Sequence, residues 1–270
     1  MKPHKDVVSY LKKTIRILKK LKIDFILEDG AAQLLGLKSD VTRERIADQA
    51  EIIILIGGDG TLLSVAGQAL DHNIPIAGFN LGSLGFLTEL GKDTLERSLI
   101  EIFTDKIKTT ERKLLEIHFK ENRNIALNDV VVNKGYIARI ISLLLMIDKQ
   151  EVAEIRADGI IISTPTGSTA YSLSAGGPIV APEVNGIVIT PLCPHSLTLR
   201  PFVVPDSSEI RVKLISRSRK VYMTMDGQRA MPISTNEYFD VKIFHKKLKL
   251  ITSKDMNYFK LLYEKLNWAL

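Results

Sequence analysis

The fold is decided by the stretch Ile52-Ile53-Ile54-Leu55-Ile56-Gly57-Gly58-Asp59-Gly60-Thr61. Its first half is an unbroken apolar run, which predicts a strand buried on both faces. Beyond it, apolar residues recur at helical spacing from Leu62 to Leu70. A strand, a glycine-rich turn and a helix start can hold a phosphate, because glycines let the backbone approach closely and free N–H groups attract anions. The stretch therefore predicts an α/β unit with an anion-binding turn.

Asp59 is the unusual residue in this turn. A carboxylate beside a phosphate is repelled by its own ligand, so it needs a chemical task such as holding Mg²⁺ or abstracting a proton. That combination indicates phosphoryl transfer. The alternative is an Asp-Gly hairpin turn, but such a turn lies between alternating strands, and this one lies between an unbroken strand and a helix. The Gly-x-x-x-x-Gly-Lys-Ser/Thr motif is absent, so Mg²⁺ or charges from elsewhere must neutralise the phosphates.

Length and composition set the broad class. A chain of 270 residues fits one large or two small domains, and 45% hydrophobic with 25% charged residues is ordinary for a globular protein. The single cysteine, Cys193, allows no intrachain disulfide and favours a reducing compartment, and CxxC and HExxH motifs, which would indicate zinc, are absent. The apolar run 140–147 is too short to span a bilayer, and an apolar signal segment is lacking at the start. We expect a cytoplasmic protein without a membrane partner.

The net charge of +6 favours anionic ligands without choosing among them. Much of it lies in 10–22, a basic amphipathic segment that could contact nucleic acid or a membrane surface. The segment carries one ordinary apolar stripe, so we interpret the basic residues as a solvated helix face and expect no nucleic-acid partner.

The chain changes character near residue 114. Before it, helices and strands alternate, which predicts a parallel, helix-covered sheet in a domain comprising 1–113 and 255–270. The expected elements there are helices at 5–21, 42–49 and 93–103, and strands at 23–27, 52–56 and 73–79. From 114 to 254, short β-rich runs follow one another without helices, which predicts a second, antiparallel β domain. A cleft between the two domains is the default ligand site.

A second cluster of polar residues follows the predicted strand 159–163. The run 164–178 is dense in small hydroxyls and glycines, and it can hydrogen-bond ribose and phosphate oxygens while Tyr171 stacks on or flanks a base. Taken alone, it could equally be a serine-rich loop capping a helix. Asn128-Asp129, before the apolar run 130–132, could likewise be a plain turn.

Taken together and in order, the motifs resemble those of the bacterial NAD kinase family. The resemblance covers the chain from about residue 45 and rests on 57–61, 80–86, 128–131, 157–178, 195–201, 226–228 and 259–268. The first glycine motif is shared with lipid and sugar kinases, so one of these is the first alternative. The run 164–178 favours the NAD kinase family over these lipid and sugar kinases.

The resemblance implies an ATP-dependent NAD kinase, in which the γ-phosphoryl of ATP passes to the 2′-hydroxyl of the adenosine ribose of NAD. ATP, NAD and Mg²⁺ are the implied ligands, the implied assembly is a homodimer or homotetramer, and the C-terminal helix should return to the first domain, beside a sandwich-like second domain. A non-catalytic NAD-binding regulator is the second alternative.

By the same resemblance, Asp59 is the general base, and no residue is assigned as a metal ligand. The implied nucleotide-binding residues are Gly57, Gly58, Gly60, Thr61, Phe86, Asn128, Asp129, Asp158, Thr166, Thr169, Ala170, Tyr171, Ser172, Leu173 and Ser174. Arg139, Arg156 and Gln228 fall where family members carry ligand contacts, and a surface or turn role is equally open for these three.

The chain departs from the family pattern at two places. Asp129 stands where the family usually has Glu, so its reach to a ribose is shorter or water-bridged. The family also opens with a strand before its first helix, and Met1-Lys2-Pro3-His4 leads directly into a helix here. We expect either a sheet without that strand or a chain that starts late.

Overall fold

The computed structural model describes residues 5–82, 84–104, 108–135, 140–217, 220–253 and 257–267. It forms two compact units, Met1–Glu111 with Leu248–Leu270, and Arg112–Lys247. The second boundary differs from the one expected at 254, because strand β17 (Leu248–Thr252) belongs to the first unit's sheet, where Ile251 pairs with Ala77.

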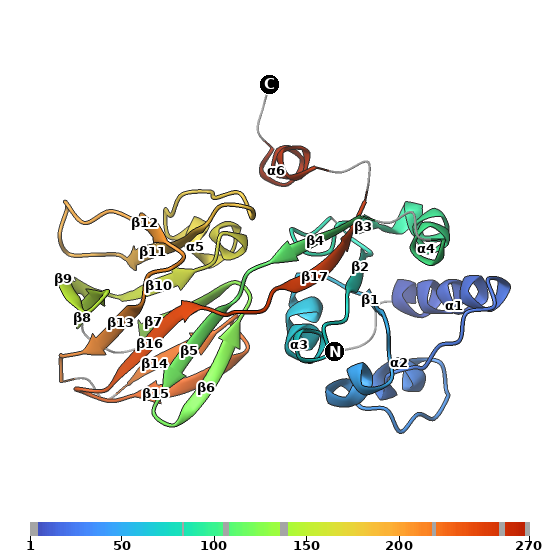
Figure 1. The fold of residues 1–270 in the computed structure, drawn as a ribbon, viewed down its shortest axis with the longest axis horizontal. Coiled ribbons are helices and arrows are strands. Elements are labelled where there is room, and N and C mark those ends of the chain that lie inside the picture. Colours follow the sequence, from blue (N-terminus) through green and yellow to red (C-terminus); the bar gives the residue numbers. More distant parts are fainter. Residues whose placement is uncertain are drawn as a thin grey trace. The chain divides into compact units, whose positions relative to one another are not determined.

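The first unit contains the predicted α/β sheet, in the strand order β1-β2-β17-β4 with β3 also on β2. The strands are β1 (Ile53–Ile56), β2 (Ile76–Asn80), β3 (Leu90–Gly91), β4 (Lys108–Arg112) and β17. Strands β1, β17 and β3 each run parallel to β2. Figure 1 shows β4 running opposite to β17, which makes the sheet mixed at this edge.

Helices α1 (Lys5–Lys20), α3 (Asp59–Asp71) and α4 (Leu95–Phe103) pack against this sheet. The unit also contains α2 (Asp29–Leu34), α6 (Tyr258–Leu266) and the 3₁₀ turns η1 (Arg43–Asp48) and η2 (Lys92–Thr94). Ile17 of α1 and Leu99 of α4 pack with Phe79 of β2 in one buried cluster. Helix α3 lies on the other side of β2 (Figure 1), and its apolar stripe, which includes Leu62 and Ala69, is fully buried.

The sequence prediction was wrong for 23–27, which is extended but pairs with no described strand. β1 is the end strand of the sheet, and 23–27 line a hollow that runs along β1 instead of bonding to it. A strand needs a neighbouring ladder, and apolar β-branched residues do not provide one. The helix expected at 42–49 is the 3₁₀ turn η1, and α2 was not predicted.

The second unit consists of two six-stranded sheets in the orders β12-β11-β10-β7-β14-β15 and β6-β5-β16-β13-β8-β9. Their strands are β5 (Leu115–Phe119), β6 (Asn122–Ala126), β7 (Asp129–Lys134), β8 (Ile141–Ile147), β9 (Gln150–Ala157), β10 (Gly159–Ser163), β11 (Gly186–Leu192), β12 (Phe202–Pro205), β13 (Ile210–Leu214), β14 (Val221–Met225), β15 (Arg229–Ile233) and β16 (Tyr238–Ile243). The pairings recorded within these sheets are antiparallel, as the sequence predicted.

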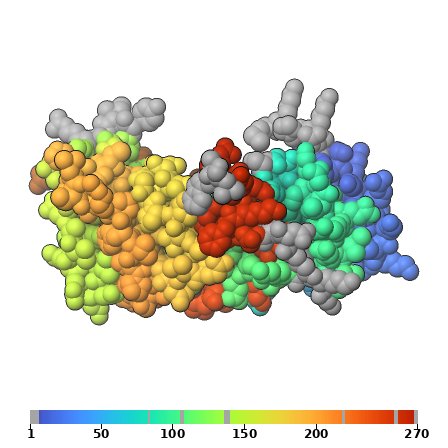
Figure 2. All heavy atoms as spheres, turned by 90° about the horizontal axis from the view of Figure 1, so that it is seen from above, coloured from blue at the N-terminus to red at the C-terminus, as the bar shows by residue number. Residues whose placement is uncertain are grey.

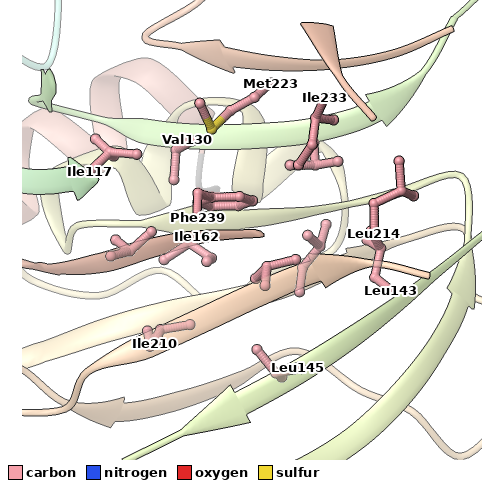
Figure 3. Close-up of a cluster of buried hydrophobic side chains, with 14 of the residues drawn as sticks. Ile117, Val130, Leu143, Leu145, Ile162, Ile210, Leu214, Met223, Ile233 and Phe239 are labelled. Carbon is pink, nitrogen blue, oxygen red and sulfur yellow. The ribbon is translucent and has the colours of Figure 1, made fainter. Parts of the chain in front are cut away.

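One apolar core joins the two sheets. Figure 3 shows Val130 and Ile162 of one sheet with Phe239 and Leu145 of the other, all of them at most 1% exposed. Alternate residues of β7 and β10 face away from this core, and there Val131, together with Ile161 and Leu192, packs against Ala175. The core therefore fixes two strands whose outer faces carry the polar residues described below.

Among the described residues, the helical elements of the second unit are η3 (Thr166–Thr169) and α5 (Tyr171–Ser174). The C-terminal helix α6 belongs to the first unit, as predicted, and is visible in red in Figure 2. It buries Leu261 and Leu262 and leaves Phe259 72% exposed. Among the described residues, no helix combines the length and the hydropathy that crossing a membrane requires.

Candidate functional site

The glycine turn connects β1 directly to α3. Gly57 donates its N–H to the carbonyl of Phe79 at 2.9 Å, and Gly58 is the N-cap of α3, without a side chain to cap the helix. A Cβ on Gly57 would lie 2.7 Å from Thr61 Oγ1, so a larger residue there would displace the Thr61 side chain. The Gly58 carbonyl accepts from Thr61 N at 2.9 Å and from Leu62 N at 3.3 Å, and this end of the helix carries partial positive charge, which attracts an anion.

Asp59 is the first residue of α3, and its carboxylate is held by the second glycine turn. Oδ1 accepts from Leu87 N (3.2 Å), Thr88 N (2.9 Å) and Thr88 Oγ1 (2.8 Å), and Oδ2 accepts from Phe86 N (2.9 Å). Each carboxylate oxygen can accept about two hydrogen bonds. Oδ2 is therefore the oxygen with acceptor capacity left for a further proton donor.

Gly85 makes this contact between the two turns possible. A Cβ at position 85 would lie 2.0 Å from Asp59 Oδ1 and 2.4 Å from Thr88 Oγ1. The sequence indicated two separate glycine-rich turns. The structure brings them together at the Asp59 carboxylate.

A hollow of about 1520 Å³ opens beside the first turn. Gly57, Gly58, Thr61 and Asn80 line one part of it, and the apolar residues of β1 line another. The volume exceeds that of a typical ligand pocket, because the hollow also follows the free edge of β1.

In the second unit, Asn128 and Asp129 stand at the start of β7 and are tied down by Asp226. The Asp226 carboxylate accepts from the backbone N–H groups of Leu127 (2.8 Å), Asn128 (2.7 Å) and Asp129 (3.1 Å). Asp226 and Gly227 both have positive φ and form the tight turn between β14 and β15, a conformation that an Asp-Gly pair adopts readily. The turn thereby positions the Asn128-Asp129 pair.

The Asp129 side chain is buried, at 4% exposed. Burial, and secondly the nearby Asp226 carboxylate, raise the pKa of Asp129 from 3.8 to about 7, and no hydrogen bond from a described residue offsets these causes. Burial also raises the pKa of Asp226, against its three backbone hydrogen bonds. Ser163, directly opposite Asp129 on β10, has a buried hydroxyl without a hydrogen-bond partner in the described structure. Uncompensated polar groups of this kind are typical of ligand sites.

We expect Asp129→Asn to stabilise the protein at pH 8 and to have little effect at pH 4. A folded-state pKa above the unfolded value means that stability is highest below about pH 4 and falls as pH rises to about 7, where the folded group also ionises. Asparagine does not ionise, so the variant avoids this loss of folding stability, which is about 4 kcal/mol at most. Melting temperatures at pH 4 and pH 8, with the exposed Glu121→Gln as control, test the expectation. An equal gain at both pH values would contradict it.

The segment after β10 packs against Asn128. Thr164 Oγ1 donates to the carbonyl of Leu127 at 2.7 Å, and a Cβ on Gly167 would lie 2.0 Å from the carbonyl oxygen of Asn128. Ser168 and Ser172 are fully buried, and their hydroxyls bond to the carbonyls of Pro165 and Val180 and to the Thr190 hydroxyl, respectively. These two serines therefore shape the loop from within.

Other predicted residues of this segment are accessible. Tyr171 is 47% exposed, and with Ser174 it lines a hollow of about 410 Å³ whose other walls come from 191–194 and 199–201. Ser174 is also exposed, Thr169, Ala170 and Leu173 are half-buried, and Thr166 is 7% exposed.

The remaining predicted residues differ in their surroundings. Asp158 forms an ion pair with Lys134, with 2.5 Å between Oδ1 and Nζ. Arg156 lies exposed on β9, and Gln228 follows the 226–227 turn, its N–H donating to the carbonyl of Met225. Arg139 lies outside the described residues.

The predicted site residues thus gather within each unit. The first unit brings together Gly57, Gly58, Asp59, Thr61 and Phe86. The second brings together Asn128, Asp129 and the 164–174 segment. The sequence analysis did not single out Thr88 or the bonding role of Asp226. The Asp-Gly pair indicates a tight turn, but not the backbone groups that its carboxylate contacts.

A glycine turn at a helix start, with a hydrogen-bonded carboxylate beside it, provides the anion-attracting helix end and the proton acceptor that phosphoryl transfer to an alcohol group requires. Two family models match the chain: the ATP-NAD kinase N-terminal domain over residues 4–107, and the ATP-NAD kinase C-terminal domain over 127–253. The chain belongs to the ATP-NAD kinase family.

Individual relatives agree with this assignment. The NAD kinase of Syntrophotalea carbinolica is 39% identical over 272 residues, which cover 98% of this chain and 95% of that protein. The NAD kinase of Geobacter metallireducens is 41% identical over 249 residues, covering 90% and 88%.

Two known structures share the fold. Yeast NADH kinase in complex with NADH superposes with a TM-score of 0.89 at 27% identity, over 99% of this chain and 86% of that one. An Archaeoglobus fulgidus NAD kinase in complex with ATP gives 0.78 at 24% identity, over 94% and 95%, a likeness of fold.

Proposed function

We propose that this protein transfers the γ-phosphoryl group of ATP to the 2′-hydroxyl of the adenosine ribose of NAD, giving NADP and ADP. The observation that carries the proposal is the Asp59 carboxylate, fixed at the start of α3 with acceptor capacity remaining on Oδ2. Family membership and relatives with this activity support the substrate assignment.

In this mechanism, Asp59 Oδ2 accepts the proton of the 2′-hydroxyl as its oxygen bonds to phosphorus. The bond between the γ-phosphorus and the bridging oxygen breaks, and ADP leaves. Phosphoryl transfer depends mainly on alignment and charge neutralisation, and the partial positive charge at the start of α3 would supply part of the neutralisation.

Magnesium enters the proposal as the MgATP substrate complex. Mg²⁺ is usually held by one or two carboxylates together with substrate phosphates and water. At the glycine turn Asp59 offers a carboxylate whose Oδ1 already accepts three hydrogen bonds, and Asp24, Glu28 and Glu51 line other parts of the same hollow. The described residues gather no group of three or more His, Cys, Asp or Glu that could hold a metal ion. This donor set fits an ion that is carried by the triphosphate.

We assign NAD binding in the second unit to Asn128, Asp129, Asp158 and the accessible residues of 166–174, with Arg139, Arg156 and Gln228 as further candidates. No described residue donates a hydrogen bond to the buried Asp129 carboxylate, and a ribose hydroxyl would supply one. Ser172, whose hydroxyl is engaged by Thr190, would contribute through the shape of the loop.

Tyr171→Ala is expected to raise the KM for NAD about 10-fold and to change kcat much less, because stacking on a base acts equally in the ground and transition states. Tyr171→Phe should keep the KM near that of the wild type. Tyr238→Ala is the matched control, because Tyr238 is also 47% exposed but lies on β16, in the sheet that does not contain β7 and β10. An unchanged KM in Tyr171→Ala would remove this residue from the binding site.

The test of the proposal is NADP⁺ formation from purified protein, NAD⁺, ATP and Mg²⁺, measured with an NADP-specific dehydrogenase. Phosphorylation of a lipid or sugar instead of NAD would favour the first alternative. NAD binding by calorimetry without any phosphoryl transfer would favour a regulator.

Location and assembly are part of the same proposal. We expect a cytoplasmic enzyme, since a single cysteine suits a reducing compartment. We expect a homodimer or homotetramer by analogy with the family, which light scattering after size exclusion can test.

A further inference from the structure

Thr88 lies fully buried between Asn80 and Asp59. Its hydroxyl donates to Asp59 Oδ1 at 2.8 Å and accepts from Asn80 Nδ2 at 2.9 Å. A hydroxyl has a single proton to donate. Because the Asn80 amide occupies an acceptor position, that proton is directed at Asp59.

The orientation of Asn80 is fixed in turn. Its Oδ1 accepts from Gly82 N at 2.9 Å, so its amide nitrogen must face Thr88. The Thr88 methyl is held by packing, since a Cβ on Gly78 would lie only 2.8 Å from Thr88 Cγ2. In the series of hydrogen bonds from Gly82 through Asn80 and Thr88 to Asp59, the donor and the acceptor of each bond are therefore fixed.

We propose that Thr88 is a positioning residue for the phosphoryl transfer and that Asn80 orients its hydroxyl. The Thr88 hydroxyl and the two backbone N–H groups of Leu87 and Thr88 occupy Oδ1, so the carboxylate cannot rotate freely and Oδ2 is presented to the acceptor hydroxyl. In the reaction, the 2′-hydroxyl proton passes to Oδ2 as the new O–P bond forms and ADP leaves. This inference rests on the proposed function and assigns a role to two residues outside the predicted nucleotide-binding set.

The test begins with Thr88→Val, which keeps the shape of the side chain and removes the hydroxyl. We expect kcat to fall about 10–100-fold, the range expected for a misplaced catalytic group, while the KM for NAD stays within about 2-fold. Thr88→Ser restores the hydroxyl and should recover most of kcat. Thr104→Val, which removes an exposed hydroxyl bonded to its own helix, is the control and should match the wild type.

A double-mutant cycle with Asp59→Asn separates positioning from structure. If Thr88 acts through Asp59, Thr88→Val should cause no further loss of kcat in the Asp59→Asn background. The same fold loss in both backgrounds would overturn the positioning role, as would a Thr88→Ser variant as slow as Thr88→Val.

Melting temperatures show whether each variant is folded. If Thr88→Val does not fold, Asn80→Ala takes its place in the cycle, because it leaves the Thr88 packing intact while freeing the hydroxyl to rotate; we expect a smaller loss of kcat that again disappears with Asp59→Asn. A wild-type protein that forms no NADP⁺ would overturn the proposed function and this inference together. An active wild type with an equally active Thr88→Val would overturn the inference alone.

Discussion

Asp59→Asn is expected to lower kcat about 10²–10⁴-fold and to leave NAD binding within several-fold of the wild type. An amide cannot accept the 2′-hydroxyl proton, and this range is typical for the loss of a general base. The amide nitrogen would also face a backbone donor such as Phe86 N–H, so one hydrogen bond is lost at a cost of about 1–3 kcal/mol. Turnover by coupled assay and NAD binding by calorimetry separate the chemical effect from the structural one.

Asp71→Asn is the matched control, because Asp71 is an exposed aspartate at the other end of the same helix. It should leave kcat, the KM for NAD and the melting temperature unchanged. Near-normal turnover in Asp59→Asn would remove this residue from the chemistry, even if the variant were less stable. A variant that lost NAD binding altogether would indicate that Asp59 shapes the site instead of reacting in it.

The strand-turn-helix of the first unit could be predicted because its signals are local. An unbroken apolar run, adjacent glycines and a following helical period each indicate one element, and β1, the turn and α3 form accordingly. The antiparallel sheets of the second unit were predictable for the same reason. Short apolar runs without helices between them leave few other arrangements.

The strand expected at 23–27 failed because strand formation depends on a partner. The apolar residues are there, but they face a hollow beside β1, and no described strand lies along that edge. β17 illustrates the opposite case. Leu248–Thr252 is distant in sequence from β2 and joins it only through tertiary pairing, which no local pattern encodes.

The candidate site likewise contains residues that local sequence motifs predicted and residues that only the structure revealed. Asp59 and Tyr171 stand in motifs that the sequence displays. The role of Thr88 follows from the structure, in which the second glycine turn lies against Asp59. The role of Asp226 follows from the hydrogen bonds that its carboxylate accepts from the backbone of 127–129. Hydrogen bonds between residues far apart in sequence are consequences of the fold, so a chain read in isolation gives the chemical group but not its partner.

The contact between the two glycine turns makes a second large effect testable. Gly85→Ala is expected to lower kcat about 100-fold, because the new Cβ would lie 2.0 Å from Asp59 Oδ1 and the carboxylate or the 86–88 backbone must move. Overpacking of this kind should also cost about 1–3 kcal/mol of stability. Steady-state kinetics and melting temperatures measure both effects.

Gly91→Ala is the control, because its Cβ would meet only Leu84 Cδ2 at 3.8 Å, an ordinary van der Waals contact. Gly91→Ala should therefore behave as the wild type, and Gly85→Ala should keep its KM for NAD if the damage is confined to Asp59. The opposite result has a definite meaning. A Gly85→Ala enzyme with normal kcat would require Asp59 to separate from 86–88 during turnover, because alanine and the four hydrogen bonds of the carboxylate cannot coexist. The positioning role of Thr88 would then fail for the same reason.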